Sequence, residues 1–339
     1  MRVAFLGSAD FSVPSLRACA LLADVAVVVT QPERPGSRGR PAPRPVAEAA
    51  SQLGLEVWQP ERLRDPAATG RLQNLRPDAL VVAAYGQILP TELLNGMPLG
   101  GINVHASLLP RWRGAAPVAA AILAGDEVTG VSLMRMDAGI DTGPVFATRS
   151  LRVSGEATTP SLTAALAELG AELLSETLPA IERGVAQAVP QPEEGATYAP
   201  RLSRADAALQ WGRADAIEVD RRVRALNPWP GVVVRLAGHD VHLLAGAPAD
   251  PVPPAPADAG ASTARPGAPS AGGEPLPAGA GPTPQPGQVI QVRGESVFVA
   301  TRAGGYRVDV LRPAGGRTMT GGAFLRGRPS SDIPPAPAA

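Results

Sequence analysis

The stretch GINVHASLLPRWRGAAP, residues 101–117, joins a short apolar strand, a tight turn and the start of a helix. Residues two apart in a strand share a face, so Asn103 and His105 project to the same side. Pro110 bounds the loop that follows, and Pro117 is well suited to the first turn of a helix. The stretch therefore predicts a strand that ends in two polar side chains and leads through a loop into a helix.

The neighbouring sequence repeats this alternation of strand and helix. Short apolar, β-branched segments occur at residues 3–6, 25–30, 80–84, 102–104, 131–136 and 145–149. Helical patterns occur at residues 15–22, 46–53 and 161–183. Such alternation is typical of a parallel sheet flanked by helices. We expect an α/β domain with a Rossmann-like, mostly parallel sheet over residues 1–184.

A second domain is expected after a polar, proline-containing linker at residues 185–202. Apolar residues recur at helical spacing over 216–226 and predict an amphipathic helix. Short strand patterns follow at residues 232–236, 241–244, 289–292, 296–300 and 307–311. They favour a small, OB-like β-barrel over residues 203–330. Residues 247–286, rich in Pro, Ala and Gly, are expected to be a disordered insertion in it.

The composition fits two domains with a sizeable core, since 45% of 339 residues are hydrophobic. A lone cysteine, Cys19, excludes an internal disulfide framework and favours a reducing compartment. No signal peptide is apparent, and no apolar run reaches the roughly 18 residues of a membrane span. We therefore expect a cytoplasmic monomer that makes no membrane contact.

The charge is uneven although its formal net value is zero. No lysine is present, so every fixed cationic side chain is an arginine. Residues 31–46 carry Arg34, Arg38, Arg40 and Arg44 against Glu33 alone. Such a basic loop suggests a polyanionic partner, and solvated surface charge is an equal alternative on these grounds.

Two clusters of polar residues are candidates for a catalytic or binding site. The first turn, residues 7–11, has no G-x-G-x-x-G pattern, which argues against a dinucleotide site. Open parallel sheets bind ligands beyond the carboxyl ends of their strands, where Asn103 and His105 stand. Asp141 lies in a turn-rich stretch between Gly139 and Gly143. Each residue alone could be a turn cap or a buried polar group, but together they favour a site.

The reaction is expected to be a direct transfer between two bound substrates. Ser107 lacks the G-x-S-x-G context of a hydrolase nucleophile, and Cys19 lies in a predicted helix. In a direct transfer, Asn103 would donate to an oxyanion while His105 and Asp141 would move protons. The sequence shows no metal-ligand spacing.

These motifs resemble the folate-dependent formyltransferase family. The resemblance is carried by Asn103-Val104-His105, by the following Ser107, Leu108, Leu109 and Pro110, and by Asp141. It implies that Asn103, His105 and Asp141 are catalytic and that residues 107–110 border the folate site. It also implies 10-formyltetrahydrofolate as co-substrate and no metal.

Further stretches resemble the members of that family that act on methionyl-tRNA. They are residues 31–40, 84–90, 111–117, 227–231 and 311–315. This resemblance implies folate contacts at Tyr85, Gly86, Ile88 and Leu89, and contacts to initiator tRNA at Arg34, Arg38 and Arg40. The chain departs from the family in its first turn, Gly7-Ser8-Ala9, and in the length of the insertion.

Three alternatives remain on the sequence alone. A related formyltransferase could use a small amine, and a hydrolase could release formate from the same folate. A third possibility is an RNA-binding protein without catalysis. The arginine-rich loop and the predicted barrel favour tRNA, and the intact Asn103, His105 and Asp141 favour catalysis.

Overall fold

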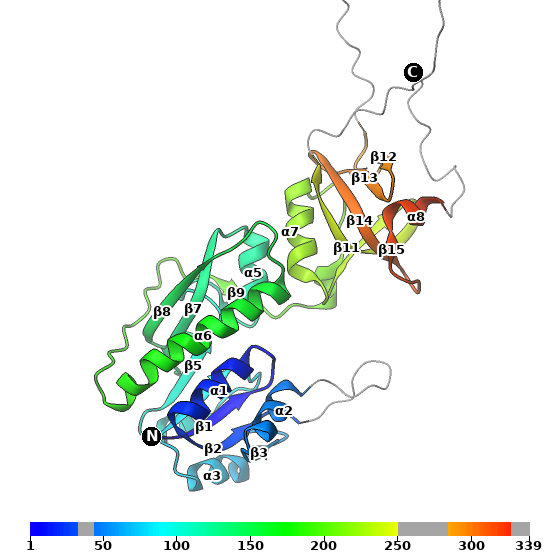
Figure 1. Cartoon of the computed structure of the whole chain (residues 1–339). Helices are drawn as coiled ribbons and strands as arrows, with labels where there is room; N and C mark the ends of the chain where they lie inside the picture. Colours follow the sequence, from blue (N-terminus) through cyan, green and yellow to red (C-terminus); the bar gives the residue numbers. More distant parts are fainter. Residues whose placement is uncertain (33–43, 250–283, 327–339) are drawn as a thin grey trace, which may run out of the picture. The chain divides into compact units, whose positions relative to one another are not determined.

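The computed structural model describes residues 1–32, 44–249 and 284–326, and it divides into two units, Met1–Leu202 and Ser203–Ala339 (Figure 1). The predicted tRNA contacts Arg34, Arg38 and Arg40 lie outside the described residues, as does most of the predicted insertion. None of the described helices combines the length and apolar character needed to span a bilayer.

The first unit alternates strands and helices as the sequence predicts. Its strands are β1 (Arg2–Gly7), β2 (Asp24–Val29), β3 (Val57–Trp58), β4 (Ala79–Ala83), β5 (Gly101–His105), β6 (Arg113–Gly114), β7 (Val128–Arg135), β8 (Val145–Arg152) and β9 (Tyr198–Ala199). Its helices are α1 (Ser12–Leu22), α2 (Pro45–Gln52), α3 (Pro66–Asn74), α4 (Thr91–Asn95), α5 (Pro117–Ala124) and α6 (Thr159–Glu182).

Seven strands form the main sheet in the order β3-β2-β1-β4-β5-β7-β8. The five strands from β3 to β5 are parallel, while β7 runs antiparallel to β5 and β8 antiparallel to β7. The prediction of a mostly parallel α/β sheet is therefore confirmed. The strand order reverses between β1 and β4, and ligands of such sheets bind beyond the carboxyl ends near this point.

Helices cover both faces of the sheet because its strands are apolar on both sides. Alternate residues of β1, β2 and β4, such as Leu6 and Val82, form a buried core cluster with Leu72 of α3 and Leu93 of α4. On the opposite face, α6 packs against β5, β7 and β8, and α1 packs against β1 and α6. Figure 1 shows the long α6 lying across the β7–β8 part of the sheet.

Serine hydroxyls tie the carboxyl ends of the central strands together. Ser8, directly after β1, donates to the carbonyl of Tyr85 and accepts from the backbone N–H of Gln31. Ser12 donates to the carbonyl of Ala83 at 2.6 Å. These bonds satisfy backbone groups that the parallel ladder leaves unpaired where the strands stop.

The second unit is an antiparallel β domain. Its elements are the 3₁₀ helix η2 (Arg204–Ala207), α7 (Ala216–Leu226), β10 (Val232–Leu236), β11 (His239–Ala249), β12 (Val289–Arg293), β13 (Ser296–Ala300), β14 (Gly305–Pro313), β15 (Met319–Thr320) and α8 (Gly321–Arg326). The sheet order is β10-β11-β14-β13-β12, with β15 beside β14. The amphipathic α7 packs against β11 and β14.

Two segment boundaries differ from the sequence-based expectation. Strand β11 continues through Ala249, because Ala247–Ala249 pair with β14. The sequence predicted that these residues belong to the insertion, since they continue its run of Pro and Ala. The segment predicted as a linker, residues 185–202, pairs with the first unit. Val189 exchanges two backbone hydrogen bonds with Val145, and β9 pairs with β6. Backbone pairing therefore fixes a segment whose composition indicated only a tether.

Close packing of α6 on the sheet requires a glycine at position 170. A Cβ atom there would lie 2.8 Å from Cγ1 of Val104, the β5 residue between Asn103 and His105. We expect Gly170→Val to lower the free energy of unfolding by about 1–3 kcal/mol, because the helix must move away from the sheet. Urea denaturation measures this change. Gly155→Val is the matched control, since no atom lies within 4 Å of a Cβ there; equal stability of the two variants would contradict the packing argument.

Candidate active site

Strand β5 places Asn103 and His105 on the sheet face opposite α6. Its register with β7 sets Asn103 beside Met134 and His105 beside Ser132. Val104, between them, points toward Gly170 of α6. Asn103 is 9% exposed and His105 is 6% exposed. Two largely buried polar side chains are thus held by the rigid backbone of a strand. This arrangement favours precise positioning of both groups.

The loop between β7 and β8 brings Asp141 to these side chains. Asn103 Nδ2 donates to Oδ1 of Asp141 at 3.3 Å, and the backbone N–H of Gly114 donates to Oδ2 at 2.8 Å. Asp141 has a φ of 54°, a left-handed conformation that costs an L-residue about 1–2 kcal/mol. The surrounding contacts must therefore hold this residue in place.

The hydrogen bond of His105 indicates which tautomer its neutral ring adopts. Nε2 lies 3.0 Å from the carbonyl oxygen of Trp112, which can only accept, so Nε2 carries the proton in the neutral ring. Nδ1 then faces Oδ2 of Asp141 at 3.7 Å. The structure thus brings together the three residues that the sequence singled out, with the imidazole and the carboxylate close enough to exchange a proton after a small movement.

The loop after β5 is tied to the sheet by two serines. Ser107, which is buried, donates to the carbonyl of Arg111 at 2.6 Å, so its proton is engaged there rather than with His105. Ser132 of β7 donates to the carbonyl of Ser107 and accepts from the N–H of Leu109. The predicted folate border, residues 107–110, is therefore a fixed turn, and Ser107 is not arranged as a nucleophile.

Arg111 and Trp112 are both fixed by Asp126. The Arg111 guanidinium binds the carboxylate through two hydrogen bonds, at 2.9 and 2.5 Å, and the indole N–H of Trp112 donates to the same group at 2.7 Å. The guanidinium also lies over the indole ring, 4.3 Å from its centroid. The side-chain hydrogen bond to Asp126 raises the pKa of Arg111. This cluster holds the backbone at Trp112, whose carbonyl orients His105.

The remaining predicted folate residues follow β4. Tyr85 is 2% exposed and belongs to the core cluster with Leu89, while Ile88 is 89% exposed. The Tyr85 hydroxyl is buried with no hydrogen-bond partner among the described residues, and this burial raises its pKa far above the ordinary value. Gly86 has a φ of 83°, which favours glycine. Residues 85–89 and 107–110 thus follow neighbouring parallel strands at one edge of the sheet.

Sequence reasoning missed four groups that support this site. They are Ser132, the backbone N–H of Gly114, the side chain of Arg113 and the amide of Gln191. A Cβ at position 114 would lie 2.6 Å from the carbonyl oxygen of Ala199, so only glycine allows this approach of β6 to β9. Arg113 lies within residues 111–117, which resemble the family, but nothing in the local sequence indicates that its guanidinium is buried. Gln191 lies in a polar segment with no periodic pattern.

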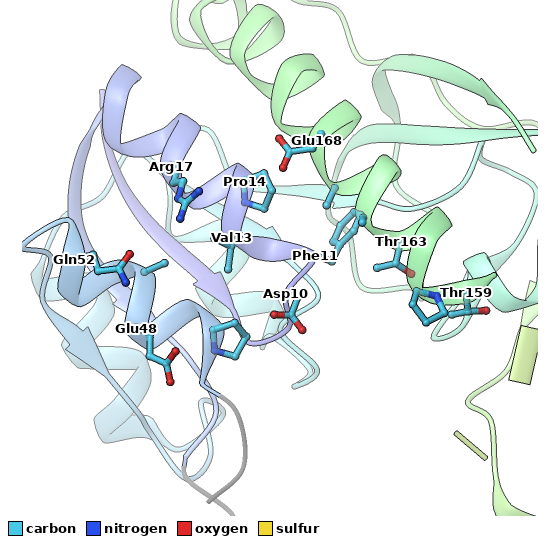
Figure 2. Close-up of a pocket in the computed structure, with 15 residues that line it drawn as sticks. Asp10, Phe11, Val13, Pro14, Arg17, Glu48, Gln52, Thr159, Thr163 and Glu168 are labelled. Carbon is cyan, nitrogen blue, oxygen red and sulfur yellow. The ribbon is translucent and has the colours of Figure 1, made fainter. Parts of the chain in front are cut away.

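Cavities in the described part of the first unit include two away from the contacts of Asn103 and Asp141. One of about 300 Å³ is lined by Leu109, by Phe146 and neighbouring residues of β8, and by residues 189–192. A larger one, of about 590 Å³, lies between α1, α2 and α6 and includes Phe11, Pro14 and Thr163 (Figure 2). None of the predicted site residues lines the larger pocket.

No group of three or more His, Cys, Asp or Glu in the described part of the chain is placed to hold a metal ion.

Solved structures with the same fold include formyl-transferring enzymes. HypX from Aquifex aeolicus aligns with 98% of this chain and 50% of its own, at a TM-score of 0.62 and 20% identity. WlaRD, a sugar 3N-formyl transferase, aligns with 94% of this chain and 97% of its own, at a TM-score of 0.62 and 13% identity. At these identities the similarity establishes the fold alone.

Sequence comparison is more specific. Residues 1–178 match the family model described as formyl transferase, and residues 201–329 match that of the formyl transferase C-terminal domain. Methionyl-tRNA formyltransferase of Heliobacterium modesticaldum is 44% identical over 97% of both chains. That of Paracoccus denitrificans is 50% identical over 72% of this chain and 81% of its own. The chain therefore belongs to the methionyl-tRNA formyltransferase family.

Proposed function

We propose that this protein transfers the formyl group of 10-formyltetrahydrofolate to the amino group of methionine on initiator tRNA. The observation that carries the proposal is the meeting of Asn103, His105 and Asp141 at the end of β5. Full-length relatives named methionyl-tRNA formyltransferase support the choice of acceptor. Such a reaction supplies the formylated initiator for translation.

Asp141 is the base in this proposal. An amino group attacks only when its lone pair is free, so the methionyl ammonium must first lose a proton. One carboxylate oxygen of Asp141 accepts from Asn103 and the other from Gly114, and each retains acceptor capacity. The carboxylate takes the proton directly or through a water. Its two anchoring bonds keep it oriented while the amine approaches.

Asn103 stabilises the oxygen of the formyl group as the amine attacks, and His105 can assist once its Nδ1 has received a proton from Asp141. The attack forms a carbon–nitrogen bond and shifts an electron pair onto the formyl oxygen, which becomes negative. Asn103 Nδ2 has a second N–H available besides the one that faces Asp141. In a nearly dry site such a donor is strong, because the low dielectric strengthens the interaction with the developing charge.

In the last step of the reaction, the bond between the formyl carbon and folate N10 breaks. N10 must gain a proton as it leaves. Nδ1 of His105, 3.7 Å from the Asp141 carboxylate, is placed to receive the proton that Asp141 took from the amine and to pass it to N10. The ammonium loses two protons in all and N10 gains one, so one proton passes to solvent.

The folate is proposed to lie along the carboxyl ends of β4 and β5. Its contacts would come from Tyr85, Gly86, Ile88 and Leu89 and from residues 107–110. This placement is supported by the sheet order, since β4 borders the point where the strand order reverses and β5 lies next to β4. The exposed Ile88 would then become covered by the ligand.

Contacts to tRNA are proposed for Arg34, Arg38 and Arg40, which carry the basic charge of residues 31–46. Cationic side chains of the second unit would add contacts to phosphates. Phosphate contacts give affinity that falls steeply with salt, while contacts to the acceptor end give discrimination.

One assay separates the proposal from its alternatives. The protein is mixed with 10-formyltetrahydrofolate and methionyl initiator tRNA, and formyl-methionine is measured. Formate released equally fast without an acceptor would instead identify a hydrolase. Faster formylation of small amines than of methionyl-tRNA would identify a small-amine formyltransferase.

Loss of the Asn103 amide should slow turnover selectively. We expect Asn103→Ala to lower kcat about 10²–10³-fold, the usual effect of removing one oxyanion donor, with little change in tRNA binding. Single-turnover kinetics and filter binding measure the two quantities. Asn95→Ala, at an exposed position at the end of α4, should behave as the unchanged chain. A normal rate for Asn103→Ala would refute the role of Asn103.

Loss of Arg38 should affect tRNA rather than folate. We expect Arg38→Ala to raise the KM for methionyl-tRNA about tenfold or more while leaving folate binding unchanged, because one cationic contact is removed. Arg62→Ala removes the same charge from an exposed position elsewhere and should have little effect. Steady-state kinetics with each substrate varied separates the two effects, and equal losses for folate and tRNA would contradict the assignment.

A further inference from the structure

The amide of Gln191 contacts the backbone of the loop that carries Asp141. Its Nε2 donates to the carbonyl oxygen of Asp141 at 2.8 Å and to that of Gly143 at 2.7 Å. Its Oε1 accepts from Nε of Arg113 at 3.0 Å. Two carbonyls can only accept and a guanidinium can only donate, so a single orientation of the amide satisfies all three partners.

These bonds form a closed ring around Asp141. The backbone N–H of Gly114 holds the Asp141 carboxylate, the neighbouring Arg113 holds Gln191, and Gln191 holds the Asp141 carbonyl. Both the side chain and the main chain of Asp141 are thereby fixed by a single unit. Such a restraint is what a non-glycine residue at a φ of 54° requires.

This ring of hydrogen bonds includes a buried charge, the guanidinium of Arg113. Arg113 is 1% exposed, and its guanidinium pairs with Gln191 and, at 3.4 Å, with Glu193. A buried guanidinium is stable only when its N–H groups are paired, so Arg113 holds residues 191–193 close to β6. Backbone pairing of Val189 with Val145, and of β9 with β6, fixes the same segment on either side.

We propose that Gln191 is a positioning residue that holds Asp141 in its reactive geometry. This inference rests on the proposed function, in which Asp141 takes a proton from the acceptor amine. Gln191 acts through Asp141 and does not contact the reacting atoms. The segment that precedes the second unit thus supplies part of the geometry of the active site.

The substitutions separate the donor role of Gln191 from its bulk. Gln191→Ala removes all three bonds. Gln191→Glu keeps the shape and the partnership with Arg113, but it removes both donors and sets carboxylate oxygens against the carbonyls of Asp141 and Gly143. The matched control is Gln187→Ala, four residues earlier at an exposed position of the same segment.

Kinetics with 10-formyltetrahydrofolate and methionyl initiator tRNA tests the proposal. We expect kcat to fall about 10–100-fold in Gln191→Ala and at least as much in Gln191→Glu, because a displacement of about 1 Å at a reacting group has effects of this size. Both KM values should stay within about twofold, as should every constant of Gln187→Ala. A kcat like that of the control in Gln191→Glu would overturn the proposal, as would a change confined to KM.

A double-substitution cycle tests whether the effect passes through Asp141. In the Asp141→Asn background, adding Gln191→Ala should lower kcat by less than about threefold, because the group that Gln191 positions is already impaired. A general structural role would instead reduce kcat by the same factor in both backgrounds, as independent sites do. That multiplicative result would count against positioning.

Hydrogen–deuterium exchange over residues 137–144 gives a readout that needs no activity. The loop should exchange at least several-fold faster in Gln191→Ala and Gln191→Glu than in the unchanged chain, while Gln187→Ala should not differ. If the unchanged chain makes no formyl-methionine, the proposed function fails, and exchange alone then decides whether Gln191 holds the loop. Unchanged exchange in both Gln191 variants overturns the inference whatever the activity.

Discussion

The fixation of Asp141 is the constraint on which the rest of the site depends. Its carboxylate is held by an amide from β5 and by a backbone N–H from β6, and its carbonyl is held by Gln191. A flexible aspartate would spend most of its time away from the imidazole. Because three different segments restrain it, the carboxylate remains beside His105.

The buried guanidinium of Arg113 explains why the segment before the second unit packs so closely. A charge taken out of water must be paired, and its partners here come from residues 191 and 193, far away in sequence. The need to pair Arg113 and the need to hold Asp141 are met by the same amide. Stability and site geometry are therefore coupled at Gln191, in a stretch whose composition resembles that of an ordinary linker.

The sheet accounts for the rest of the arrangement. Parallel strands end at a common edge, so segments that follow β4 and β5 lie side by side although about twenty residues separate them. The apolar runs made these strands predictable. The short α3 was not predicted, since Gly70 and polar residues weaken its helical pattern, although Asp65-Pro66 is a recognisable start. The two-residue strands β6 and β9 have no sequence pattern at all, because only their mutual pairing defines them.

The sequence by itself predicted the α/β fold of the first unit, a second domain of short strands, and the meeting of Asn103, His105 and Asp141 at the end of a strand. Periodicity and motif spacing are local properties, and local properties can be read from one chain. Only the tertiary structure decided the tautomer of His105, the hydrogen-bond partner of the Ser107 hydroxyl and the contacts of Gln191. Each of these depends on a hydrogen-bond partner whose position is set by the packing of other segments, and a one-dimensional pattern does not contain that position.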